Sequence, residues 1–93
     1  MSDAKVTERI IFRGRVQGVG FRATTHALSA GRPVTGYVRN LHDGSVELVV
    51  SGSAAAINEF VTSITNRFGD HLSGHDRQVV STGETFPDFR IRH

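Results

Sequence analysis

The sequence predicts an α+β fold in which two helices alternate with short strands. Three observations support this: alternating apolar residues that indicate strands, a helical apolar stripe after residue 53, and an Asp-Gly turn between two strands. The predicted order is β-α-β-β-α-β, with an extra C-terminal strand as an open alternative. This is the order of the ferredoxin-like sandwich, a mainly antiparallel sheet with two helices on one face. A chain of 93 residues with 38% hydrophobic residues is enough for one such core.

The first part of the chain predicts a strand, a loop and a helix. Residues 7–13 alternate, with Ile10 and Phe12 on one face, as in a strand. Residues 14–20 read GRVQGVG and contain too many glycines for a regular element, so a loop is expected. A helix is expected over 21–30, ending before Pro33, because proline disfavours helical geometry in the residue before it. Residues 1–6 are expected to be a flexible tail.

The second part predicts a hairpin, a longer helix and short strands. The strands of the hairpin cover 34–41 and 45–50, and Asp43-Gly44 supplies the turn. The helix has Ser53 as its N-cap, Gly69 just after its end, and one apolar stripe made of Ile57, Phe60, Val61, Ile64 and Phe68. Residues 70–77 are expected to form a polar loop, followed by short strands at 78–81 and 89–92.

Composition excludes several classes of function. The chain has no cysteine, which excludes disulfide frameworks, thiol nucleophiles and cysteine-ligated metal centres. A formal net charge of only +2 is weak support for nucleic-acid binding, and we expect no nucleic-acid partner. The apolar runs are too short for a membrane span and the N-terminus lacks a signal-peptide core. We therefore expect a cytoplasmic protein with no membrane partner, and a monomer because no long apolar strip demands a dimer.

The glycine-rich loop is the segment best suited to binding an anion. It lies between a predicted strand and a predicted helix, where backbone N–H groups and a helix N-terminus can converge. Arg22, in the first turn of that helix, can add a bidentate contact to a phosphoryl group. The spacing does not fit a dinucleotide-binding fingerprint, and the Gly-Lys-Ser/Thr of a P-loop is missing. An ordinary glycine loop without a ligand is the structural alternative.

Two segments resemble the signatures of the acylphosphatase family. The first is GRVQGVGFR at 14–22, and the second is GYVRN at 36–40 followed by DGSVE at 43–47. The closing FRI at 89–91 is similar to the family's C-terminal strand. The resemblance runs from about Arg9 to the end, and implies one domain over 1–93 with the ferredoxin-like fold. Pro33 departs from the family pattern, which has a left-handed glycine there, and this leaves the end of the first helix open.

The resemblance implies an enzyme that hydrolyses the carboxyl–phosphate bond of acyl phosphates. The products would be a carboxylate and inorganic phosphate, with no metal and no cofactor. It implies that Arg22 binds the substrate phosphate and that Asn40 holds the attacking water. The loop amides that would join Arg22 are those of Arg15, Val16, Gln17, Gly18, Val19, Gly20 and Phe21. Neither the resemblance nor the residues indicate which acyl group is attached.

Two other functions remain open. One is a noncatalytic domain that binds phosphate or carbamoyl phosphate, like the acylphosphatase-like module of hydrogenase maturation proteins. The other is an RNA-binding module of the same topology, although the predicted strands lack the aromatic pattern that such modules use.

Four histidines are candidate functional residues. His71 and His75 have helical metal-ligand spacing but no carboxylate pair beside them, so we expect both to be exposed. We expect His42 to be a turn residue and His26 a surface residue.

Overall fold

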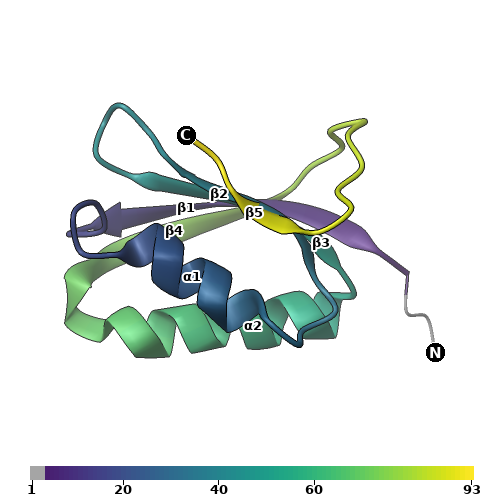
Figure 1. The fold of residues 1–93 in the computed structure, drawn as a ribbon, viewed down its shortest axis with the longest axis horizontal. Coiled ribbons are helices and arrows are strands. Elements are labelled where there is room, and N and C mark those ends of the chain that lie inside the picture. Colours follow the sequence, from purple (N-terminus) through teal and green to yellow (C-terminus); the bar gives the residue numbers. More distant parts are fainter. Residues whose placement is uncertain (1–3) are drawn as a thin grey trace.

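The computed structural model describes residues 4–93 and contains one mixed sheet with two helices on one of its faces (Figure 1). The elements are β1 (Val6–Gly14), α1 (Phe21–Ser29), β2 (Thr35–Asn40), β3 (Val46–Gly52), α2 (Ala54–Phe68), β4 (Leu72–Val79) and β5 (Phe89–Ile91), with a short 3-10 turn at Gly69–His71. The strand order is β4-β1-β3-β2-β5, and only β2 and β5 are parallel neighbours. The predicted ferredoxin-like fold is confirmed, and β5 is the additional C-terminal strand.

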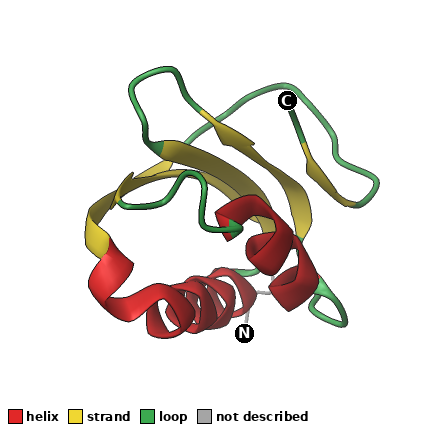
Figure 2. Ribbon diagram, turned by 60° about the vertical axis from the view of Figure 1, so that its left-hand side comes forward, coloured by secondary structure: helices red, strands yellow, loops and turns green. Residues whose placement is uncertain are grey.

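The core lies between the sheet and the helices. In Figure 2 both helices lie on the same side of the curved sheet, and the other side carries no helix. Ile10 and Phe12 from β1 are fully buried there, because alternate side chains of a strand point to the same face. The whole apolar stripe of α2 is buried against them, as its helical spacing predicts.

The caps of α2 are those that the sequence indicates. The Ser53 hydroxyl accepts a hydrogen bond from the Ala56 amide at 3.1 Å, which satisfies one of the free N–H groups of the first turn. Gly69 follows the last helical residue with a φ of 43°. The sequence therefore determines both ends of this helix locally.

The first helix ends earlier than its expected limit at residue 30. It stops at Ser29, and Gly31 takes a left-handed φ of 76°. Glycine has no steric penalty in this conformation, so the chain turns at Gly31. The family pattern has its glycine two residues later, at the position of Pro33. Pro33 lies between the turn and β2, which begins at Thr35.

The loop expected over 70–77 is wrong, because most of this segment is strand β4. Residues Glu8 to Gly14 of β1 pair with β4 in antiparallel register. β4 is an edge strand whose residues 73–79 are all exposed, so no apolar alternation reveals it in the sequence. The backbone hydrogen bonds to β1 hold the strand, with Leu72 against the core and Arg77 paired with Glu8 as side-chain contacts.

The expected tail at 1–6 lies in part outside the described residues. Ala4 and Lys5 belong to no helix or strand, whereas Val6 already pairs with Gly52 in β1. Within the described part of the chain, no helix is long and apolar enough to cross a membrane.

Candidate functional site

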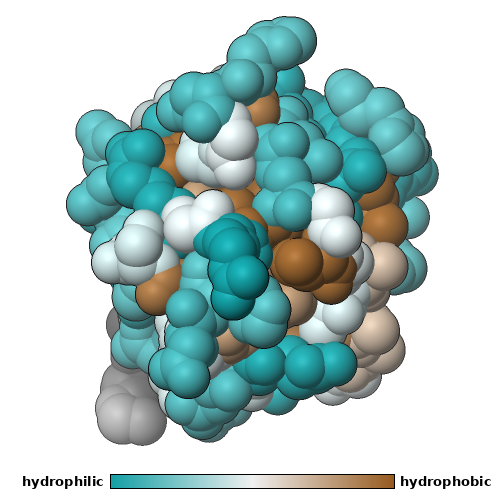
Figure 3. Space-filling model, turned by 90° about the vertical axis from the view of Figure 1, so that its left-hand side faces the viewer, coloured by the Kyte–Doolittle hydropathy of each residue, from teal (hydrophilic) through white to brown (hydrophobic). Residues whose placement is uncertain are grey.

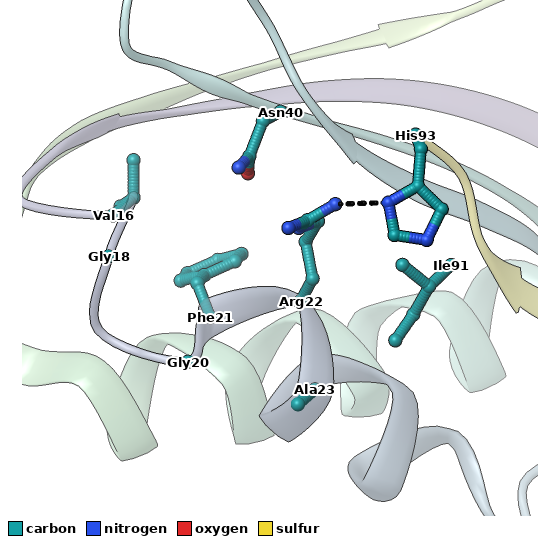
Figure 4. Close-up of a pocket in the computed structure, with 9 residues that line it drawn as sticks. All are labelled: Val16, Gly18, Gly20, Phe21, Arg22, Ala23, Asn40, Ile91 and His93. Carbon is teal, nitrogen blue, oxygen red and sulfur yellow. Dashed lines mark hydrogen bonds between the residues drawn. The ribbon is translucent and has the colours of Figure 1, made fainter.

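A cavity of about 290 Å³ opens where the glycine-rich loop, the start of α1 and the ends of β2 and β5 meet. Figure 3 views this end of the molecule, whose surface is mostly hydrophilic with smaller apolar areas between the polar residues. Figure 4 shows the lining side chains. They are Val16, Gly18, Gly20, Phe21, Arg22, Ala23, Asn40, Ile91 and His93. The cavity thus contains both side chains that the sequence analysis singled out, Arg22 and Asn40.

Buried side chains anchor both ends of the loop. Val16 and Phe21 are each only 1% exposed, and they anchor the loop in the core. Between them Gly18 and Gly20 have φ values of 79° and 76°, which other residues rarely adopt. The backbone N–H groups of Val16, Gly18 and Val19 donate to no protein acceptor within residues 4–93. These unpaired donors next to a helix N-terminus can bind an anion.

Arg15 does not contribute its amide to this set of free donors. Its N–H donates to the His71 carbonyl at 2.8 Å. The contact is possible because Gly14 has no side chain: a Cβ at that position would lie 2.3 Å from the same carbonyl oxygen. The available loop amides therefore begin at Val16, one residue later than the resemblance implies.

Aromatic packing fixes the position of the first turn of α1. The ring of Phe21 lies 5.2 Å from that of Phe12 and 4.3 Å from that of Phe68, between centroids. This places the next residue, Arg22, at the edge of the cavity with its guanidinium directed toward the Asn40 side chain (Figure 4). Within the described residues, Arg22 has no carboxylate partner, and its guanidinium hydrogen-bonds only to His93. No carboxylate side chain of the described residues therefore pairs with its positive charge.

Asn40 is the last residue of β2 and lies opposite Val46 of β3. Pairing with β3 extends to Asn40 itself, whereas pairing with β5 covers only residues 36–38 of the same strand. Figure 4 shows its amide group directed into the space between Phe21 and Arg22. An amide side chain does not titrate, but it donates and accepts hydrogen bonds, so it can hold a water molecule there.

Gln17 links the loop to the hairpin that follows Asn40. Its side-chain amide donates to the Leu41 carbonyl at 2.7 Å and to the Ser45 carbonyl at 2.9 Å. This fixes the loop relative to the end of β2. The resemblance implies only a role for the backbone amide of Gln17, and no local pattern in the sequence indicates this contact of its side chain.

The turn of the same hairpin carries a carboxylate that is held in its charged form. Hydrogen bonds from the Ser45 hydroxyl and the Ser45 amide lower the pKa of Asp43 below its ordinary value. Both bonds stay within the turn, and Asp43 does not line the cavity. Asp43 thus shapes the hairpin, as expected for a turn residue.

The histidines considered as metal ligands lie away from the cavity. His75 is exposed on β4, as expected, with its ring 5.6 Å from that of Phe12. The expectation that His71 is exposed is wrong: it is half-buried, and its ring hydrogen-bonds to the Phe68 carbonyl. Residues 4–93 contain no cluster of three or more histidine, cysteine, aspartate or glutamate residues with metal-binding geometry. His26 and His42 are exposed, as expected.

Three lining residues were not identified from the sequence: Ala23, Ile91 and His93. Ala23 follows the arginine on α1, and the other two belong to the C-terminal segment. For Ile91 and His93, the signal that could have revealed them is the FRI motif at 89–91, since a strand that pairs in parallel with β2 ends on the same side as Asn40.

Comparison with known proteins gives consistent results over the whole chain. The family model named Acylphosphatase matches residues 8–91. An acylphosphatase of Synechococcus sp. (strain JA-2-3B'a(2-13)) is 56% identical over 92 residues, covering 99% of this chain and 97% of that protein. The crystal structure of acylphosphatase from Bacillus subtilis has a TM-score of 0.85 at 31% identity, covering 95% of this chain and 99% of that one. The fold also resembles part of full-length HypF, with a TM-score of 0.83 at 22% identity, over all of this chain and 12% of that one.

Proposed function

The chain belongs to the acylphosphatase family and hydrolyses acyl phosphates to a carboxylate and inorganic phosphate, and on this premise we propose which residues perform the reaction. Arg22 and the free loop amides bind the phosphate, and Asn40 positions the attacking water. The observation that carries the proposal is that three groups lie at one cavity. Among the described residues these are a guanidinium with no carboxylate side-chain partner, loop amides with no protein acceptor, and a neutral carboxamide.

Phosphate binding by Arg22 has a clear electrostatic reason. Charge in phosphoryl transfer is spread over the three equatorial oxygens, and catalysis consists mostly of positioning and charge stabilisation. The planar guanidinium can contact two of these oxygens at once. The amides of residues 16–21 and the N-terminus of α1 would receive the others, without a metal ion.

Asn40 positions the attacking water but does not accept its proton. A carboxylate is a good leaving group, so the reaction needs no strong general acid. The carboxamide holds the water on the side of the phosphorus opposite the leaving group. The proton lost by the attacking water goes to a phosphate oxygen, because Asn40 itself cannot accept it.

Substitution of Arg22 tests the anchor. Arg22→Ala should abolish most hydrolysis of benzoyl phosphate and most competitive inhibition by inorganic phosphate. Arg22→Lys should also be poor, since a point charge does not replace a planar fork. Arg90→Ala is the control: it removes the same charge from a side chain that is 67% exposed and paired with Asp88 away from the cavity. If either Arg22 variant is inhibited by phosphate as strongly as the wild type, Arg22 is not the anchor.

Substitution of Asn40 tests the positioning of water. Asn40→Ala should lower kcat by about 10²–10³-fold while phosphate affinity stays near that of the wild type, the pattern for loss of one positioned polar group. Asn40→Asp is nearly isosteric but adds a negative charge, so it should be inactive and bind phosphate more weakly. A wild-type kcat in Asn40→Asp, with a pH profile that reveals a new carboxylate base, would contradict this role.

The same assay separates the enzyme from the noncatalytic alternative, because a domain that only binds phosphate releases none from benzoyl phosphate. The cytoplasmic location and the monomeric state stay predictions from the sequence. Cell fractionation and sedimentation equilibrium measure them directly.

A further inference from the structure

One residue of the cavity has no part in the mechanism proposed above, yet it contacts the proposed phosphate anchor. The Nδ1 atom of His93 lies 3.1 Å from Nη1 of Arg22 (Figure 4). A guanidinium only donates hydrogen bonds, so Nδ1 must be the acceptor. The imidazole is therefore neutral in this arrangement and carries its proton on Nε2. A protonated imidazole has no free acceptor and could not make this bond.

The backbone that carries His93 is well fixed. β5 pairs with β2 up to Ile91, and the Arg92 amide donates to the Val38 carbonyl at 2.9 Å. The Arg92 side chain is held on the helix-free face, where its guanidinium lies 3.9 Å from the centroid of the Tyr37 ring and pairs with Glu84. His93 follows β5 and therefore starts from a restrained backbone position. β5 lies next to β2, the strand that ends in Asn40.

Among residues 4–93, no other side chain makes a polar contact with Arg22. From α1 the nearest titratable neighbour on the same face is His26, one turn further, and its ring faces Phe89 at 6.3 Å between centroids. From β2 the cavity receives the neutral Asn40, and from β5 the apolar Ile91. Within the described residues, Arg22 and His93 are the only residues with charged or titratable side chains that line this cavity. The hydrogen bond that Arg22 donates to His93 is thus the one side-chain polar contact of the described residues that orients the guanidinium.

We propose that His93 is a positioning residue, whose neutral imidazole holds the Arg22 guanidinium beside the loop amides before the substrate arrives. This rests on the proposed role of Arg22 as phosphate anchor. An arginine side chain that is already ordered loses less conformational freedom when phosphate binds. His93 does not take part in the chemical step.

The proposal predicts a specific kinetic pattern. Ordering of Arg22 is needed equally for substrate, transition state and product, so its loss raises KM and leaves kcat unchanged. The inhibition constant of inorganic phosphate should rise by the same factor. For one rotamer-rich side chain the factor is about 2- to 10-fold.

Two variants of His93 and one control provide the test. In His93→Asn the Oδ1 atom can take the place of Nδ1 as the hydrogen-bond acceptor, so we expect KM and the phosphate inhibition constant near the wild-type values. His93→Ala removes the acceptor and should raise both constants, with unchanged kcat. His26→Asn removes a histidine from α1, the helix that carries Arg22, and should keep the wild-type KM.

Several outcomes would overturn the proposal. One is a His93→Ala enzyme with wild-type KM, and another is a His93→Asn enzyme whose KM is raised as much as that of His93→Ala. A large drop in kcat in His93→Ala would mean that His93 acts in the chemical step.

A double variant separates this inference from the anchor role of Arg22. Phosphate binding is measured by calorimetry for Arg22→Ala with and without His93→Ala. If His93 acts through Arg22, adding His93→Ala changes nothing once Arg22 is gone. If Arg22→Ala alone leaves phosphate binding intact, the anchor role fails. If Arg22→Ala weakens binding but His93→Ala in the wild-type background does not, only the positioning role of His93 fails.

Discussion

The side chain of Gln17 should be important for activity although it does not line the cavity. Its amide group donates to the carbonyls of Leu41 and Ser45 at 2.7 and 2.9 Å, and so joins the glycine-rich loop to the hairpin after Asn40. Gln17→Met keeps the length of the side chain and removes both bonds. Gln17→Glu keeps its shape but places one carboxylate oxygen, in the position of Nε2, against two carbonyl oxygens.

The effect on stability can be worked out from the partners. A neutral hydrogen bond contributes about 0.5–1.5 kcal/mol, so two could contribute about 1–3 kcal/mol. Both carbonyls, however, keep a second donor: Leu41 accepts from the Gly44 amide, and Ser45 accepts from the Leu41 amide. Neither is left unsatisfied, and Gln17 is exposed, so Gln17→Met should lower the free energy of unfolding by only about 1 kcal/mol. Gln17→Glu should lose more, about 2 kcal/mol, because of repulsion between the oxygens.

The effect on catalysis should be larger than this stability change suggests. The bonds set the distance between the loop amides and Asn40, and a displacement of about 1 Å between reacting groups can lower the rate by about 10²-fold. We expect kcat/KM for benzoyl phosphate to fall about 10-fold in Gln17→Met and further in Gln17→Glu. Urea unfolding shows whether the variants remain folded during the assay. If both folded variants keep the wild-type kcat/KM, the link between loop and hairpin does not position the site.

Two further predictions concern stability at low pH and metal ions. Burial of Glu47 would raise its pKa, but hydrogen bonds from Arg9 and Arg39, each 2.6 Å long, lower it below the ordinary value of 4.5. A lowered folded-state pKa gives stability that is complete above about pH 4.5 and is lost as pH falls through the lowered value. Glu47→Gln should therefore lower the free energy of unfolding at pH 7 by about 2 kcal/mol, the usual scale for a charge-assisted hydrogen bond. In urea unfolding, the variant should lose less of this free energy than the wild type between pH 5 and pH 3. Equal acid sensitivity in both proteins would contradict this. Dialysis against EDTA should leave hydrolysis unchanged, and activity that is lost and then restored by zinc or magnesium would contradict a metal-independent reaction.

The sequence by itself determined the elements whose side chains are buried on one face. Ile10 and Phe12 show the strand period and the stripe of α2 shows the helical period, because burial of one face requires those spacings. Ser53 and Gly69 indicated the helix ends, since capping is local chemistry. Arg22 and Asn40 were found through the two signature segments, and the structure brings both to one cavity.

Tertiary structure alone decided the features that depend on pairing between distant segments. β4 carries no apolar pattern because it is an edge strand held by backbone bonds to β1, so its sequence resembles a loop. The amide of Arg15 is taken up by the carbonyl of His71, a residue 56 positions away that comes close only because Gly14 has no side chain. His93 reaches Arg22 only because β5 pairs in parallel with β2, and no local property of residues 89–93 specifies that partner. The sequence thus determined which groups are available for the chemistry, and the pairing of the strands determined which of them meet.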